Sequence, residues 1–346
     1  MSKLDLIVTH YNEPWETGAK FFAMLDLQRD IHFDDIHVIV INDGEDCALP
    51  EEHFVHRPYT VEQITIPHGG ISAARNAGIK AATAEWIAFC DFDDMYANAY
   101  ALRDVLNVLP ATGYDMLWTE FISEDRMKDG AHRLHMRGEN QVFIHGRFFR
   151  RQTLLDLDLW FDTELKYNED SAFVTIFNVL VDYKRTGKIK CTAPCYIWCF
   201  TENSLTTKPG NNAKAMQGAY YRNKKVCEAF KRRLPHDRYC NMIARTFIDT
   251  YYTLNIHGDL PPELLDVKAD FKRFYTEHKA EYAEVPKSTL REIKAVSRAE
   301  HTRGEQEAEE RWAIDHVDKV DESINVTTWL ANLEAEINKE IDGKGE

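Results

Sequence analysis

Short runs of Val, Ile and Leu alternate with amphipathic segments through the first hundred residues, and this alternation constrains the fold more than any other feature. Four runs predict strands short enough for a sheet that is buried on both faces: residues 4–10, 36–42, 62–68 and 85–91. Residues 15–30 and 71–83 have the spacing of helices. Strand–helix–strand repetition predicts an α/β fold, with a mostly parallel sheet and flanking helices.

The rest of the chain predicts a mixed segment followed by a helical one. The mixed segment begins with a helix at 98–109 and a strand at 114–123. A strand that turns into a helix at Gly146 follows over 141–156. A loop that ends in a helix covers 161–180, and a last strand covers 188–201. From about residue 210 the sequence is rich in Lys and Glu and has a helical pattern. We therefore expect a domain over 1–205, divided near residue 100, and a helical C-terminal region over 206–346.

Composition indicates a globular protein with about two domains, since the chain has 346 residues of which 44% are hydrophobic. The net charge of -15 argues against non-specific attraction to nucleic acid or anionic lipid. The N-terminus lacks the features of a signal peptide, and no stretch approaches about 20 uninterrupted apolar residues, so we expect a cytoplasmic protein without a transmembrane segment. Seven cysteines without framework spacing indicate reduced thiols.

Three acids, Asp91, Asp93 and Asp94, follow the fourth predicted strand in "FCDFDD". Carboxylates this close repel one another unless a cation joins them, and Mg²⁺ or Mn²⁺ prefers such oxygen ligands. Side chains alternate along an extended chain, so Asp91 and Asp93 point to one side and can share one ion. In the alternative interpretation the acids cap a helix that begins near Ala97, and Asp94 is the acid that this interpretation fits best.

Polar side chains also follow the other predicted strands, where open α/β sheets bind their ligands. The segments "VTHYNEP", "VINDGED", "GGISAARNAGIKAA", "WIAFCDFDD" and "YNEDSAF", in this order, resemble the family-2 type of inverting glycosyltransferases with the GT-A fold. The resemblance covers roughly residues 3–205. It implies a Rossmann-like GT-A domain, a nucleotide-diphosphate sugar as donor, a UDP-sugar before others, and Mn²⁺ or Mg²⁺ as cofactor.

The resemblance also implies which residues bind the nucleotide. Thr9 and Tyr11 would meet the base, with the backbone near Asn12 supporting the turn. Asp43 would accept a hydrogen bond from an imide N–H such as that of uracil. Arg75 would approach the base or a diphosphate oxygen.

The same resemblance implies the catalytic acids. Asp93 matches the metal-binding aspartate, with Asp91 as its ribose or metal partner and Asp94 as a third metal candidate. Asp170 matches the general base, and Glu169 lies beside it. Inverting transfer needs a base and a metal on opposite sides of the sugar, which requires acids on separate segments. The family's usual serine after "DG" is Glu45 here, so a phosphate contact by that residue is in doubt.

Several other groups have simpler interpretations. His145 and the arginines of "IHGRFFRR" are able to touch the sugar, the acceptor or the diphosphate, although a basic helix face explains the arginines. For His68 two interpretations are open: a position close to the nucleotide, or simply the end of a strand. Cys191, Cys195 and Cys199 recur every fourth residue without a histidine partner, so zinc is not favoured there.

Two other functions remain open from the sequence. A sugar-phosphate nucleotidyltransferase also uses metal-binding acids on a Rossmann-like sheet, and a non-catalytic nucleotide-sugar-binding or scaffold protein would use the helical tail as its surface. The acceptor is unresolved among a glycan, a glycolipid, a protein and a modified DNA base. The C-terminal helices can serve either acceptor binding or assembly of a homo-oligomer.

Overall fold

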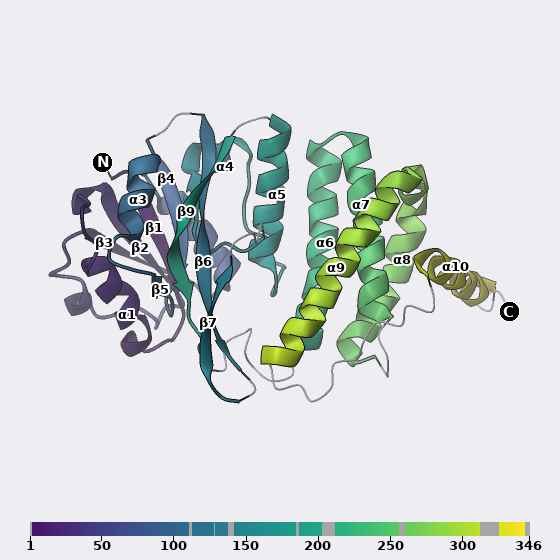
Figure 1. Ribbon diagram of the computed structural model, residues 1–346, viewed down its shortest axis with the longest axis horizontal. Helices are drawn as coiled ribbons and strands as arrows, with labels where there is room; N and C mark the ends of the chain where they lie inside the picture. Colours follow the sequence, from purple (N-terminus) through teal and green to yellow (C-terminus); the bar gives the residue numbers. More distant parts are fainter. Residues whose placement is uncertain are drawn as a thin grey trace. The chain divides into compact units, whose positions relative to one another are not determined.

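A computed structural model describes residues 2–110, 113–127, 129–137, 142–184, 187–202, 212–255, 260–311 and 325–342 (Figure 1). The chain divides into two compact units. The first comprises Met1–Arg126 and His132–Glu202, and the second comprises Met127–Ala131 and Asn203–Glu346. None of the helices in these described ranges is both long and apolar enough to cross a membrane.

One sheet forms the centre of the first unit. Its strands are β1 Leu4–His10, β2 Ile36–Asp43, β3 Thr60–Ile66, β4 Trp86–Asp91, β5 Met95–Tyr96, β6 Tyr114–Arg126, β7 His132–Arg137, β8 Arg147–Arg150 and β9 Gly187–Trp198. Their order is β3-β2-β1-β4-β8-β6-β9-β5, with β7 paired to β6. The first four run parallel, and beyond them β8 is antiparallel to both β4 and β6.

Helices cover this sheet, namely α1 Trp15–Asp26, α2 Ile71–Ala81, α3 Ala101–Val108, α4 Arg151–Asp156 and α5 Glu169–Lys184. Phe21 and Phe22 of α1 are fully buried in one core cluster with the side chains of β1 and β2, and each such ring contributes roughly 1.5–3 kcal/mol through burial. Helix α2 lies close to β1, since a Cβ on Gly78 would be 2.2 Å from Cγ2 of Ile7. The predicted α/β class, with flanking helices and a helical C-terminal region, is confirmed.

A buried carboxylate fixes the connection from α2 to β4. Asp5 of β1 accepts hydrogen bonds from the backbone N–H groups of Thr83 (2.6 Å) and Ala84 (2.8 Å), and its other oxygen lies 3.3 Å from Nδ1 of His37. Burial raises the pKa of Asp5, but the hydrogen bonds outweigh burial and the pKa falls below its usual value. Folding therefore stabilises the charged form of this acid.

Two local predictions are wrong. Gly146 does not turn a strand into a helix, because it has a φ of +67° and precedes strand β8, while α4 begins only at Arg151. The expected basic helix face is also wrong for Arg147, which is buried within β8. Glycine tolerates this positive φ in the turn that precedes β8, and the apolar run after the turn stays in the sheet.

The interpretation of the acids as helix caps near Ala97 is wrong as well. Asp91 to Asp94 form a tight turn in which the N–H of Asp94 donates to the carbonyl of Asp91 over 3.2 Å. Strand β5 follows at Met95–Tyr96, and α3 begins only at Ala101. Asp94 is fully buried, so it is not an exposed acid at a helix start.

The second unit is helical, with α6 Asn212–Arg233, α7 His236–Leu254, α8 Pro262–Glu284, α9 Lys287–Arg311 and α10 Val326–Asp342. Helix α7 contacts the other four. Its Phe247 packs 5.3 Å from the rings of both Phe271 and Tyr275. Lys224 of α6 pairs with Asp270 of α8.

Candidate active site

The carboxyl ends of β2, β1 and β4 lie next to one another, and the predicted site residues leave the sheet there. Thr9 of β1 lies opposite Asp91 of β4, and His10 lies opposite Asn42 of β2. The parallel pairing therefore brings together positions that are 32 and 82 residues apart in sequence. They lie at the carboxyl ends of the strands, where open α/β sheets bind their ligands.

Asp43, at the end of β2, holds the loop that leads into α2. One carboxylate oxygen accepts the N–H of Gly69 (2.7 Å), and the other accepts the N–H of Gly70 (2.9 Å) and lies 3.0 Å from Nδ1 of His68. The side chain is buried. Its contact with a nucleotide base stays a prediction, and the observed contacts show that it organises this loop.

Tyr11 presents an aromatic surface beside this loop. Its ring stacks on His68 with centroids 4.3 Å apart and planes 19° apart, and 45% of the residue is exposed. Asn12 follows with a φ of +59°, and its side-chain oxygen accepts a hydrogen bond from Sγ of Cys47 over 3.1 Å. Glu45, which follows β2, is exposed.

Arg75 of α2 joins the two halves of the site. Its guanidinium donates to a carboxylate oxygen of Asp91 over 3.0 Å and to one of Glu169 over 2.8 Å. The side chain is only 3% exposed. The Arg75 side chain therefore offers little exposed surface for the predicted contact with a base or a diphosphate. Its contacts with the two carboxylates are direct.

Glu169 and Asp170 form the first turn of α5, as expected from the sequence. Glu169 is buried, and Asp170 is partly buried, with one oxygen accepting the N–H of Ser171 over 2.7 Å. Burial, and then the charge of Glu169, raise the pKa of Asp170 to about 7, although Arg75 acts in the opposite direction. Asp170 therefore changes charge in the physiological range.

The three acids after β4 differ in their surroundings. Asp91 is partly exposed. Burial raises its pKa, but the charge and the hydrogen bond of Arg75 lower it below its usual value. Asp93 is also partly exposed, and burial together with the charge of Asp91 raises its pKa. Asp94 is buried, accepts the N–H of Cys199 over 2.8 Å, and has a pKa well above the usual value, chiefly through burial.

His145 is the neighbour of these acids that sequence reasoning ranked low. Its ring stacks on Tyr196 and Trp198 at 5.5 and 5.3 Å, and burial lowers its pKa to about 4, so it is neutral at pH 7. Its Nδ1 lies 3.9 Å from Oδ2 of Asp94. Arg147 is a second side chain that sequence reasoning ranked low. The charge of Asp170 acts on its buried guanidinium, so Arg147 lies near the predicted base.

Two sets of side chains fit a divalent cation here. Asp91 and Asp93 offer two partly exposed carboxylates, which is the hard-oxygen set that Mg²⁺ and Mn²⁺ prefer. The ligand atoms of Asp91, Asp94 and His145 lie within 4.8 Å of one another, but Asp94 and His145 are buried. In the described part of the chain, the cysteines at 191, 195 and 199 do not come together as a metal-ligand set.

Comparison with known proteins finds similarity within the first unit. Residues 5–165 match the family model for glycosyl transferase family 2. The chain is 27% identical over 202 residues to the uncharacterized glycosyltransferase EpsJ of Bacillus subtilis, which covers 51% of this chain and 56% of EpsJ. It is 23% identical over 185 residues to the poly(ribitol-phosphate) beta-N-acetylglucosaminyltransferase TarS of Staphylococcus aureus, covering 50% of this chain and 32% of TarS.

The chain thus spans about half the length of EpsJ and about a third of TarS. The crystal structure of residues 1–349 of S. aureus TarS superposes with a TM-score of 0.57 at 15% identity, covering 87% of this chain and 92% of that one. The likeness shows a common fold. Residues 5–165, which carry the site segments at the ends of the parallel strands, are thus similar to glycosyl transferase family 2, and the chain has the GT-A fold.

Proposed function

We propose that the chain is a metal-dependent inverting glycosyltransferase that moves a sugar from a nucleotide-diphosphate donor, a UDP-sugar, to an acceptor hydroxyl. The observation that carries the proposal is the buried guanidinium of Arg75. It ties Asp91, at the end of β4, to Glu169, at the start of α5. A donor-side acid and Glu169, the neighbour in sequence of the predicted general base Asp170, are thereby held at one site by a single side chain.

Asp170 has the properties of a general base for this reaction. The base must remove a proton from the acceptor hydroxyl, and a pKa near the working pH combines the deprotonated form with sufficient basicity. The pKa of Asp170 is about 7 because of burial and the charge of Glu169. Arg75 and Arg147 supply positive charge beside it.

Asp91 and Asp93 would hold the divalent cation, Mn²⁺ or Mg²⁺. When bound, such a cation takes up negative charge on the departing diphosphate. Arg75 keeps Asp91 ionised and fixes its orientation. Asp94, which is buried and bonded to the backbone of Cys199, anchors the turn that carries Asp93.

The exposed ring of Tyr11, backed by His68, offers a stacking surface for the nucleotide base, next to the loop that Asp43 organises. In the proposed organisation, 1–100 binds the donor, 101–205 binds the acceptor and completes the site, and 206–346 is the helical region. A cytoplasmic location and self-association through the helical region belong to the same proposal. Size-exclusion chromatography measures the self-association.

The acceptor class is proposed from one relative. TarS is named as a poly(ribitol-phosphate) beta-N-acetylglucosaminyltransferase. UDP-N-acetylglucosamine is therefore the first donor to test, and a polyol-phosphate chain is the first acceptor, before a glycolipid, a protein or a modified DNA base.

The proposal is tested with the full chain and a panel of UDP-glucose, UDP-galactose and their N-acetyl derivatives, each with Mn²⁺ and with EDTA. We expect at least one donor to raise the melting temperature and to be hydrolysed slowly in an EDTA-sensitive reaction. Failure of every nucleotide sugar to stabilise the protein would contradict the proposal. Release of pyrophosphate from a nucleoside triphosphate and a sugar phosphate would instead indicate a nucleotidyltransferase.

A further inference from the structure

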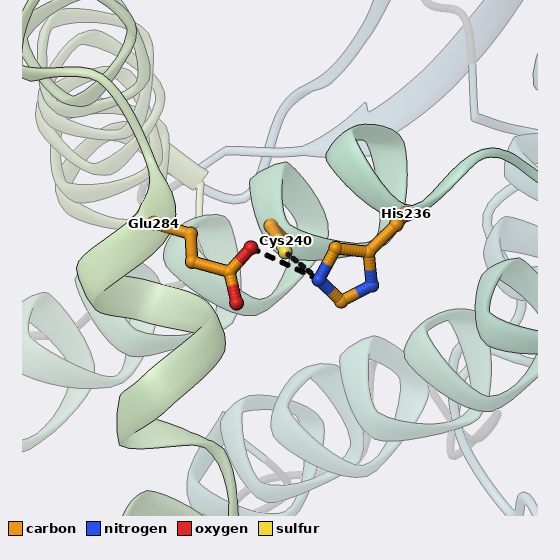
Figure 2. Close-up of side chains that lie close together, drawn as sticks. All are labelled: His236, Cys240 and Glu284. Atoms are coloured by element: carbon orange, nitrogen blue, oxygen red, sulfur yellow. Dashed lines mark hydrogen bonds and ion pairs between the residues drawn. The ribbon is translucent and has the colours of Figure 1, made fainter.

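Outside the candidate active site, the helical unit brings together three side chains of types that bind metal ions. His236 and Cys240 lie one turn apart on α7, and Glu284 is the last residue of α8. Figure 2 shows the three side chains pointing toward one another. Nε2 of His236 is 3.1 Å from a carboxylate oxygen of Glu284 and 3.4 Å from Sγ of Cys240.

Hydrogen bonds satisfy only part of this cluster. One imidazole nitrogen either donates a proton to the carboxylate or accepts one from the thiol, so Nε2 of His236 cannot serve both partners at once. A cation between the three atoms contacts all of them. A four-coordinate zinc ion with bonds of about 2.0–2.3 Å spaces its ligand atoms roughly 3.4–3.6 Å apart, close to the 3.1 and 3.4 Å found here.

The electrostatic setting favours a cation. Glu284 lies at the negative end of α8, where a carboxylate is unfavourable without a nearby cation. The charges of Glu281 and Asp237 also act on Cys240, so the cluster lies in a negative potential.

The cluster is accessible and its frame is rigid. The side chains of His236 and Glu284 are 61% and 57% exposed, whereas Cys240 is buried. An ion can therefore arrive from solvent and keep water as a fourth ligand. Behind the cluster, Cys240 packs with Ala244 and Val285, so apolar contacts hold the end of α8 against α7.

We propose that His236, Cys240 and Glu284 bind a transition-metal ion of the Zn²⁺ class that joins the start of α7 to the end of α8. Imidazole, thiolate and carboxylate together favour zinc or cobalt over Mg²⁺ and Mn²⁺, which prefer oxygen ligands alone. Binding breaks the S–H bond of Cys240, forms a metal–sulfur bond and releases the proton to solvent. No electron transfer is involved, and the site stabilises the helical unit.

Cobalt(II) is the probe, because a thiolate ligand gives it a near-ultraviolet charge-transfer band. The reduced, EDTA-treated full chain is titrated with CoCl₂ in excess Mg²⁺, and then with ZnCl₂. We expect one equivalent of Co²⁺ to produce the band, Zn²⁺ to remove it, and saturating Zn²⁺ to raise the melting temperature by about 5 °C. Cys240→Ser abolishes the band.

Exposed positions keep the test independent of folding. Glu284→Gln weakens Co²⁺ binding by more than about tenfold, since even the loss of outer-shell partners costs 10–100-fold in affinity. Glu277→Gln, at an exposed position of the same helix and outside the trio, serves as the matched control and binds as the wild type does. Absence of the band in the wild type, its persistence in Cys240→Ser, or equal losses in Glu277→Gln and Glu284→Gln would each overturn the proposal.

Discussion

The contacts of Arg75 predict the effect of replacing it with methionine, which has a similar length and no charge. The change removes two charge-assisted hydrogen bonds, of 3.0 Å to Asp91 and 2.8 Å to Glu169. It leaves both carboxylates without their shared cation. Both are largely shielded from water, with side chains 24% and 11% exposed.

Two estimates of how much Arg75→Met lowers the free energy of unfolding agree. Removing one partner of a buried ion pair costs about 3–5 kcal/mol, and two hydrogen bonds to charged groups, at about 1.5–3 kcal/mol each, give a similar sum. Asp91 is the more exposed carboxylate and regains some hydration. We therefore expect Arg75→Met to lower the free energy of unfolding of the first unit by about 3 kcal/mol.

Urea unfolding followed by circular dichroism measures this loss. Arg126→Met removes a surface ion pair of 2.8 Å with Glu202 in the same unit, and it should cost less than about 1 kcal/mol. Arg75→Met with Glu169→Gln should recover part of the loss, because one uncompensated carboxylate is gone. Equal stabilities of Arg75→Met and Arg126→Met would refute the reasoning.

Three further predictions follow from other contacts. Asp5→Ala leaves two backbone N–H groups without an acceptor and should destabilise the protein by about 3 kcal/mol; because folding lowers the pKa of Asp5, the difference from wild type in urea unfolding should begin to shrink as the pH falls below about 4 and shrink further as the pH passes the lowered pKa of the folded state. Because the pKa of Asp170 is about 7, kcat/KM for sugar transfer should fall as the pH drops below about 7. Arg75 lowers the pKa of Asp170, so Arg75→Met should shift this acidic side of the pH profile to higher pH. Gly78→Ala places a Cβ 2.2 Å from Cγ2 of Ile7 and should lower stability in thermal melts by about 1–3 kcal/mol; an unchanged melting temperature would contradict the packing.

The parallel half of the sheet was predictable because burial on both faces leaves continuous apolar runs. The predicted ranges 4–10, 36–42 and 85–91 match β1, β2 and β4 within one residue at each end. Strand β3 at Thr60–Ile66 is displaced by two residues, since an edge strand with exposed positions has a weaker pattern. The short β5 and the polar, exposed β7 have too little apolar signal to be found.

The site was predictable where it depends on the ends of parallel strands, as for Thr9 and Asp91. The partners of Arg75 were not, because its contact with Glu169 joins residues 94 positions apart and depends on how α2 and α5 pack. The burial of Asp94 was not predictable for the same reason, because it depends on a contact between distant segments. The N–H that donates to Asp94 belongs to Cys199, after β9. Local sequence shows that three acids are adjacent, and only the tertiary fold separates their environments.

The central claim is that Asp170 acts as the base for sugar transfer at a site organised by Arg75. The most direct test compares turnover of a UDP-sugar by the wild type and by Asp170→Asn, with donor affinity measured by calorimetry in both. We predict that Asp170→Asn binds the donor within about threefold of the wild-type affinity and loses more than about 100-fold in kcat. Equal turnover in both proteins, or donor binding with no turnover in either, would contradict the claim.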